Sequence, residues 1–271
     1  MFLKCEMKKR NYFCILLSVI MIMVTACCAF AQEEETTKEV KYKNGYPVVE
    51  IESPIHYNGA YNNDAKKLAK SHPFEDYQNY ILFYGDSNFR LWRDTIENDF
   101  PEYRVIDHGF GGSTAVDLVH FANTLLFRYQ SPIVILQNGL NDFGVLSGED
   151  DSARSDELIN YREEMLNAFH EIMPNTVFIF VSTLIVPGRT EFFDLAMDVN
   201  RRTKEMADQY DFLYFVDSTD LTYDGTEFHE DLFIEDGLHL TDEARTAWAD
   251  QYIKPVIEQI ITEYHFDSLR K

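Results

Sequence analysis

The chain has 271 residues, 45% of them hydrophobic and 26% charged, which is ordinary for a globular protein built around one α/β core. Its formal net charge is −22, and removal of the first 26 residues, which carry four basic side chains and one acidic one, leaves about −25. A surface this acidic repels phosphate backbones and anionic headgroups, which argues against nucleic acid as a partner and against direct membrane binding.

The N-terminus has the pattern of a secretory signal. A basic stretch at residues 8–10 precedes an apolar run over residues 12–24, and small residues follow. Two processing sites stay open: Val-Thr-Ala-Cys ending at Cys27 resembles a bacterial lipobox, whereas Ala-Phe-Ala before Gln32 resembles an ordinary signal-peptidase site. An uncleaved membrane helix is the remaining alternative. We predict a signal peptide at residues 1–31 and an exported protein, either a bacterial cell-surface lipoprotein anchored at Cys27 or a freely secreted one.

The positions of the cysteines and prolines indicate how the chain after the signal is organised. All four cysteines precede residue 29, so we expect no disulfide, no cysteine zinc site and no cysteine nucleophile in the mature domain. Residues 32–79 begin with an acidic tether and continue as an irregular segment interrupted by Pro47, Pro54 and Pro73. We expect this segment to wrap over the main domain with one short strand or helix. The main domain is predicted over residues 80–271.

Five short apolar segments have the composition of buried strands. They are apolar almost throughout, which is typical of a parallel sheet covered on both faces, and they span residues 80–84, 103–106, 133–137, 177–181 and 212–216. Apolar residues recur at helical spacing in the segments that follow them, near residues 89–100, 115–126, 158–172, 195–206 and 242–261. We expect Pro255 to kink the last helix. The alternation predicts a three-layer, doubly wound α/β sandwich with about five parallel strands.

Polar blocks follow four of these five strands, at the edge where such sheets bind ligands. Ser87 follows the first strand, Gly112 the second and Asn141 the third, while Asp236 and His239 follow the fifth. Each block alone is more common in a turn or a helix cap than in an active site. Together at one edge they predict a catalytic site.

The residue types fit acyl transfer. A serine hydroxyl becomes a useful nucleophile when an imidazole accepts its proton and a carboxylate orients that imidazole. We therefore predict Ser87, His239 and Asp236 as the catalytic residues. A tetrahedral intermediate also needs hydrogen-bond donors for its oxyanion, and the candidates are the backbone N–H groups of Ser87 and Gly112 and the side-chain amide of Asn141.

At these positions the chain resembles a known family. Ser87, Gly112, Asn141 and His239 match, in order, the four signature residues of the SGNH hydrolase superfamily, also called GDSL esterases and lipases. The resemblance extends from residue 80 to about residue 261 and is strongest to small bacterial exported members. It implies a flavodoxin-like fold and an acyl hydrolase that needs no metal. Asp107 departs from the Asn that many members carry before the glycine block, which puts the hydrogen bonding behind that loop in question. Asn88, where many members have Leu, is expected to be neutral.

Competing motifs are missing from the sequence. It contains no Gly-x-Ser-x-Gly elbow, and His170-Glu171 and His229-Glu230 lack the second histidine of a zinc helix. No glycine-rich phosphate loop with a lysine is present either. We therefore expect neither a cofactor nor a metal.

The predicted function is hydrolysis of carboxylic esters, with short acyl groups such as acetyl on a carbohydrate or similar polar alcohol favoured. Two alternatives stay open. One is a lysophospholipase or lipase of the same superfamily, for which Phe110, Phe143, Phe192 and Phe193 could line an acyl channel. The other is a surface glycan-binding protein without activity. The expected partner is a small-molecule or carbohydrate ester, with membrane contact only through a lipid at Cys27, and the oligomeric state stays open.

Overall fold

The computed structural model describes residues 41–43, 46–53, 57 and 60–271. The predicted signal peptide, the lipobox at Cys27 and the start of the acidic tether lie outside the described residues. Of the predicted wrap, the described part contains a hairpin of two-residue strands, β1 (Tyr42–Lys43) and β2 (Tyr46–Pro47), and the helix α2 (Asn62–Ser71).

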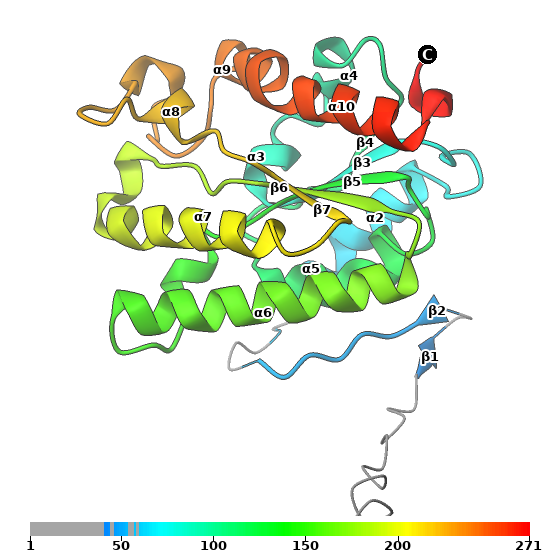
Figure 1. Ribbon diagram of the computed structural model, residues 1–271, viewed down its shortest axis with the longest axis horizontal. Coiled ribbons are helices and arrows are strands. Elements are labelled where there is room, and N and C mark those ends of the chain that lie inside the picture. The colour runs from blue at the N-terminus through cyan, green and yellow to red at the C-terminus, as the bar shows by residue number, and fades with distance from the viewer. Residues whose placement is uncertain (1–40, 44–45, 54–56, 58–59) are drawn as a thin grey trace, which may run out of the picture. The chain divides into compact units, whose positions relative to one another are not determined.

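The centre of the fold is a five-stranded parallel sheet (Figure 1). Its strands are β3 (Ile81–Gly85), β4 (Val105–Asp107), β5 (Ile133–Gln137), β6 (Val177–Val181) and β7 (Leu213–Val216), in the order β4-β3-β5-β6-β7. Every neighbouring pair is parallel. This is the flavodoxin-like order, and the predicted fold class is confirmed. The strands are added first on one side of β3, with β4, and then on the other side, with β5, so the winding of the sheet switches at β3. Ligands bind at such a switch point.

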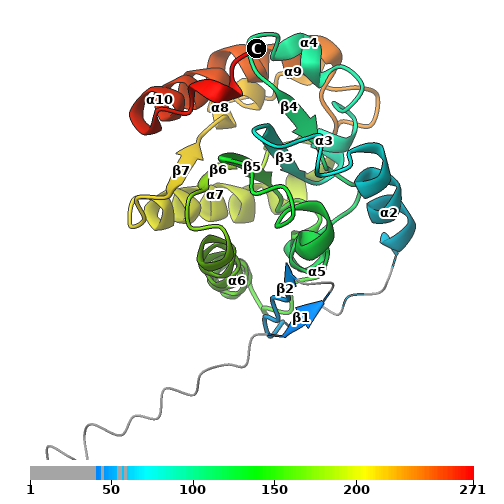
Figure 2. The same ribbon diagram turned by 90° about the vertical axis from the view of Figure 1, so that its right-hand side faces the viewer.

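Helices cover both faces of the sheet (Figures 1 and 2). On one face, alternate strand residues such as Leu82 and Leu136 pack with α5 (Ala115–Leu125), α6 (Asp151–Ile172) and α7 (Phe193–Ala207). On the other face, Phe83 and Ile135 pack with α9 (Asp242–Trp248) and α10 (Lys254–Tyr264). Burial on both faces is why the strands lack alternation. None of the described helices combines the length and the apolarity needed to cross a bilayer.

Two predicted helices differ from the structure. The stripe over residues 89–100 is divided into α3 (Ser87–Arg90) and α4 (Ile96–Asp99), joined by a turn that still buries Trp92. The last helix contains a π-helical turn, Ala249–Ile253, between α9 and α10, and Pro255 lies in the first turn of α10. Proline has no N–H to donate to the preceding turn, and a wider turn before it accommodates that loss. A short helix α8 (Thr219–Thr222) follows β7.

Trp248 joins the helix that follows His239 to the helix that begins at Ser87. Its ring stacks on Trp92 with centroids 5.6 Å apart and lies 6.0 Å from Phe89, and all three side chains are fully buried. The indole N–H donates to Ser218 Oγ at 3.0 Å. A large aromatic side chain therefore fixes α9 against α3.

Replacing Trp248→Ala should lower the free energy of unfolding by about 3–5 kcal/mol, because it leaves a cavity between α3 and α9 and removes the hydrogen bond from the indole to Ser218 Oγ. Urea denaturation of the purified protein measures this. Met197→Ala on the exposed face of α7 is the control and should change stability by no more than about 0.5 kcal/mol. Equal, small losses in both variants would contradict this account of the packing.

Candidate active site

Ser87 is presented at the point where β3 turns into α3. Asp86 is the N-cap of α3, and its carboxylate accepts a hydrogen bond from the backbone N–H of Asn88 at 2.9 Å. The side-chain nitrogen of Gln137, in the amide orientation that satisfies its neighbours, lies 2.8 Å from Asp86 Oδ1. Burial raises the pKa of Asp86 to about 7, against the opposing hydrogen bond from Asn88. Ser87 itself is the first residue of the helix, so its backbone N–H has no partner within the helix.

Asp236 and His239 lie on a tight loop before α9. The loop turns at Gly237, whose φ of +65° is in the left-handed region that glycine adopts without strain. Asp236 Oδ1 accepts hydrogen bonds from the backbone N–H groups of Leu238, at 2.8 Å, and His239, at 3.0 Å. Thr241 then caps α9 by accepting a hydrogen bond from the N–H of Ala244. These contacts hold the two side chains on the same side of the loop.

The three residues form a continuous chain of hydrogen bonds. Asp236 Oδ2 lies 2.6 Å from His239 Nδ1, and His239 Nε2 lies 2.8 Å from Ser87 Oγ. Desolvation opposes ionisation of Asp236, but the hydrogen bonds from the His239 side chain and from the loop backbone outweigh it and lower its pKa. An ionised carboxylate requires a proton on Nδ1, so the lone pair of Nε2 faces the serine hydroxyl. The arrangement can therefore accept a proton from Ser87.

The predicted oxyanion donors lie around the same hollow. A cavity of about 420 Å³ is lined by Ser87, Gly112, Asn141 and His239, together with Asp64, Asp86, Asn88, Arg90, Gly111, Leu140, Arg189 and Leu238. Gly112 has φ +77°, and a Cβ there would lie 2.8 Å from the hydroxyl of Tyr61. Asn141 donates one side-chain N–H to the carbonyl of Ser113 at 3.1 Å. Because an amide has two N–H donors, the second is left for another acceptor.

Buried polar groups behind the cavity fix these loops. Asp142 accepts hydrogen bonds from the first N–H of α5, at Ala115, and from Asn138 Nδ2. Arg162, fully buried on α6, donates to the carbonyl of Asn138 and to Thr203 Oγ1, each at 2.7 Å. Sequence reasoning missed this network. Its one visible signal is the basic residue inside the apolar stripe of α6.

Asp107, the departure noted in the sequence, is fully buried at the end of β4. Its Oδ1 accepts a hydrogen bond from the N–H of Gly109 at 2.6 Å, and Arg93 Nε lies 3.9 Å from the same oxygen. Its other oxygen has no hydrogen-bond partner within the described chain. Burial raises the pKa of Asp107 to about 7, although the Arg93 charge opposes this. The carboxyl anchors the glycine loop, as an Asn oxygen would.

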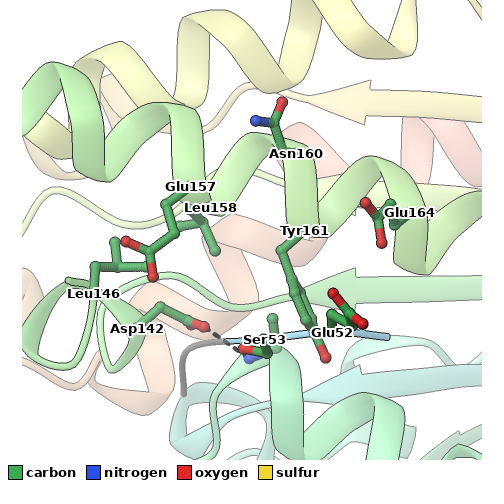
Figure 3. Close-up of a pocket in the computed structure, with 10 residues that line it drawn as sticks. Glu52, Ser53, Asp142, Leu146, Glu157, Leu158, Asn160, Tyr161 and Glu164 are labelled. Carbon is green, nitrogen blue, oxygen red and sulfur yellow. Dashed lines mark hydrogen bonds between the residues drawn. The ribbon is translucent and has the colours of Figure 1, made fainter. Parts of the chain in front are cut away.

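A second cavity, of about 210 Å³, contains none of the predicted catalytic residues (Figure 3). Figure 3 shows the carboxylates of Glu52, Asp142, Glu157 and Glu164 around it, with Tyr161 between them. Across the described residues, no group of three or more His, Cys, Asp or Glu side chains has the arrangement of a metal site.

The sequence matches the model of the GDSL-like lipase/acylhydrolase family over residues 75–247, and the chain belongs to this family within the SGNH superfamily. The family places it among hydrolases. A comparison with curated proteins finds no match.

Solved structures share the fold at low identity. A GDSL-like lipase from Bacteroides thetaiotaomicron is 19% identical, with a TM-score of 0.57 over 74% of this chain and 98% of its own. An acetyl-xylooligosaccharide esterase from a Geobacillus species is 17% identical, with a TM-score of 0.52 over 67% and 94%. A carbohydrate esterase of family 3 from Talaromyces cellulolyticus is 17% identical, with a TM-score of 0.51 over 68% and 98%.

The buried carboxyl of Asp107 should make stability depend on pH. A raised pKa in the folded state means that this group stabilises the protein below the pKa of the unfolded chain, near 4, and that the contribution is lost as the pH rises through about 7. In Asp107→Asn the contribution does not titrate. The stability of wild type relative to the variant should therefore fall between pH 5 and pH 8, by about 2.7 kcal/mol at most.

Urea denaturation of both proteins at pH 5, 6, 7 and 8 measures this difference. Parallel pH profiles for the two proteins would show that Asp107 keeps an ordinary pKa in the folded state.

Proposed function

We propose that the protein is a serine esterase in which Ser87 is the nucleophile, His239 the general base and acid, and Asp236 the residue that orients His239. The observation that carries the proposal is the pair of hydrogen bonds, 2.6 Å from Asp236 to His239 and 2.8 Å from His239 to Ser87. A structural role alone does not require an imidazole between a carboxylate and a solvent-accessible serine at the switch point of the sheet.

The proposed reaction has two halves. Ser87 Oγ bonds to the carbonyl carbon of the ester while its proton moves to His239 Nε2, and the oxyanion accepts hydrogen bonds from the N–H groups of Ser87 and Gly112 and from the Asn141 amide. The bond from that carbon to the alcohol oxygen then breaks, and His239 returns the proton to the alcohol. Water attacks the acyl-Ser87 by the same route and releases the carboxylic acid and free Ser87.

Ser87→Ala should lower kcat on 4-nitrophenyl acetate by more than a thousandfold, because it removes the nucleophile of the proposed triad. A fluorophosphonate probe should label the wild type and not the variant. Circular dichroism and thermal melting serve as the folding control. Near-native turnover by a folded Ser87→Ala protein would overturn the proposal, and a folded wild type that neither hydrolyses esters nor labels would favour the binding-protein alternative.

For the substrate we infer a short acyl group, acetyl above all, on a carbohydrate or similar polar alcohol. The cavity supports this because Leu140 and Leu238 are the larger apolar side chains among its lining residues. The four phenylalanines that could have lined an acyl channel do not contribute to it: Phe110 and Phe143 are buried in the core, and Phe192 and Phe193 pack against it. The carbohydrate esterases among the solved structures of this fold agree with the inference.

A series of 4-nitrophenyl esters from acetate to decanoate should show kcat/KM falling as the chain lengthens beyond four carbons. Each methylene buried in an apolar channel would instead contribute about 0.8 kcal/mol, or roughly fourfold in kcat/KM. A steady rise to octanoate or beyond would replace this inference with the lysophospholipase or lipase alternative.

A further inference from the structure

Two arginines line the same cavity as Ser87 and His239. Arg90 is the last residue of α3, three positions after Ser87, and Arg189 lies in the 3₁₀ segment Pro187–Phe192 before α7. Neither side chain makes an ion pair or a hydrogen bond with any described residue. Other arginines of the chain do have such partners, since Arg154, Arg201, Arg202, Arg245 and Arg270 each have a carboxylate within 4 Å.

Arg90 is placed against the loop that carries Gly112. A Cβ at Gly111 would lie 2.7 Å from Arg90 Nε and 3.4 Å from its Cδ and Cζ. The side chain therefore crosses directly over the glycine backbone, and a larger residue at position 111 would displace it. The guanidinium is thus held next to one of the proposed oxyanion donors.

Arg189 is placed by the loop that carries Asp236 and His239. The N–H of Gly188 donates to the carbonyl of Gly237 at 2.9 Å, and a Cβ at Gly188 would lie 2.8 Å from the carbonyl oxygen of Asp236. Arg189 itself leaves helical geometry, with φ −145° and ψ 47°. This close backbone contact fixes the segment before α7 to the loop of the triad, so Arg189 keeps its position at the cavity.

The two guanidinium groups place two positive charges at this cavity, in a chain whose net charge is −22. The cavity's lining carboxylates form no ion pair with them: Asp86 is buried with its own hydrogen bonds, and the exposed Asp64 has no ion pair with either arginine within the described chain. Guanidinium groups bind carboxylate and phosphate oxygens through paired N–H donors. Two arginines without ion pairs, one at the end of α3 and one before α7, on either side of the proposed nucleophile's cavity are suited to an anionic ligand.

We propose that Arg90 and Arg189 select esters whose alcohol part carries a carboxylate or phosphate group near the scissile bond. The inference rests on the proposed esterase function. The anionic group belongs to the alcohol because the acyl group proposed above is short and uncharged. Acidic sugars and sugar phosphates share this chemistry.

The test compares an anionic ester with a neutral one in the same enzyme. We choose 3-carboxy-4-nitrophenyl acetate against 4-nitrophenyl acetate and measure the ratio of their kcat/KM values. The ratio cancels any general damage to the site, and it should fall about tenfold or more in Arg189→Ala and in Arg90→Ala, with a further fall in Arg189→Glu. Lys204→Ala removes one exposed, unpaired cation from α7 and should leave the ratio and both rates unchanged.

The source of the anion is distinguished with acetylated sugars. O-acetyl glucuronate and O-acetyl glucose 6-phosphate are each compared with O-acetyl glucose in wild type and in both alanine variants, and the larger loss identifies carboxylate or phosphate. An unchanged ratio in all arginine variants would overturn this inference while leaving the esterase intact, because the neutral ester is still hydrolysed. Failure of the wild type on every ester would instead overturn the proposed function.

Discussion

The hydrogen bond between Ser87 and His239 joins residues 152 positions apart in the chain, and much of the fold serves to bring them together. Ser87 is fixed by the end of β3, whereas His239 comes from a loop beyond the last strand. The two are brought into contact because α3 and α9 cover the same face of the sheet and the Trp92–Trp248 stack joins them. A shift of 1 Å between these helices would break a contact of 2.8 Å.

The buried aspartates at the strand ends show how the remaining donors are positioned. Asp86 bonds the N–H of Asn88, Asp107 that of Gly109, and Asp142 that of Ala115. Each carboxyl directs a backbone loop at the point where β3, β4 or β5 ends. Burial raises the pKa of Asp86 and Asp107 to about 7 and that of Asp142 to about 6. The hydrogen bonds that fix these loops therefore require carboxyl groups whose charged form is destabilised by desolvation.

The strands were predictable because burial on both faces leaves a nearly continuous apolar run. Their ends differ from the predicted ones by no more than two residues, as at β4 (Val105–Asp107) against 103–106. The break between α3 and α4 was not predictable from spacing, since Phe89, Trp92, Ile96 and Phe100 are buried whether the backbone is helical or turned. The order of the sheet depends on contacts between distant segments, which periodicity does not record.

Some residues of the site were predictable from the sequence and others were not. The structure brings Ser87, His239 and Asp236 together and sets Gly112 and Asn141 around the same cavity, as expected for residues that follow the strands of one parallel sheet. The position of Arg189 at the cavity was not predictable, because it depends on the hydrogen bond between the backbones of Gly188 and Gly237. Arg90 was equally hidden, since a basic residue at the end of a short helix is ordinary on any surface.

The net charge of −22 and the two cavity arginines act over different distances. Charges separated by more than about 8 Å are largely screened at physiological ionic strength, so the acidic surface mainly slows the approach of anions. A guanidinium within hydrogen-bonding distance of a bound anion is much closer than this screening distance, so its attraction is far less weakened. In the selection proposed for Arg90 and Arg189, the two arginines therefore act on a small anionic group once it has reached the cavity, whereas the net charge of the chain acts only on its approach.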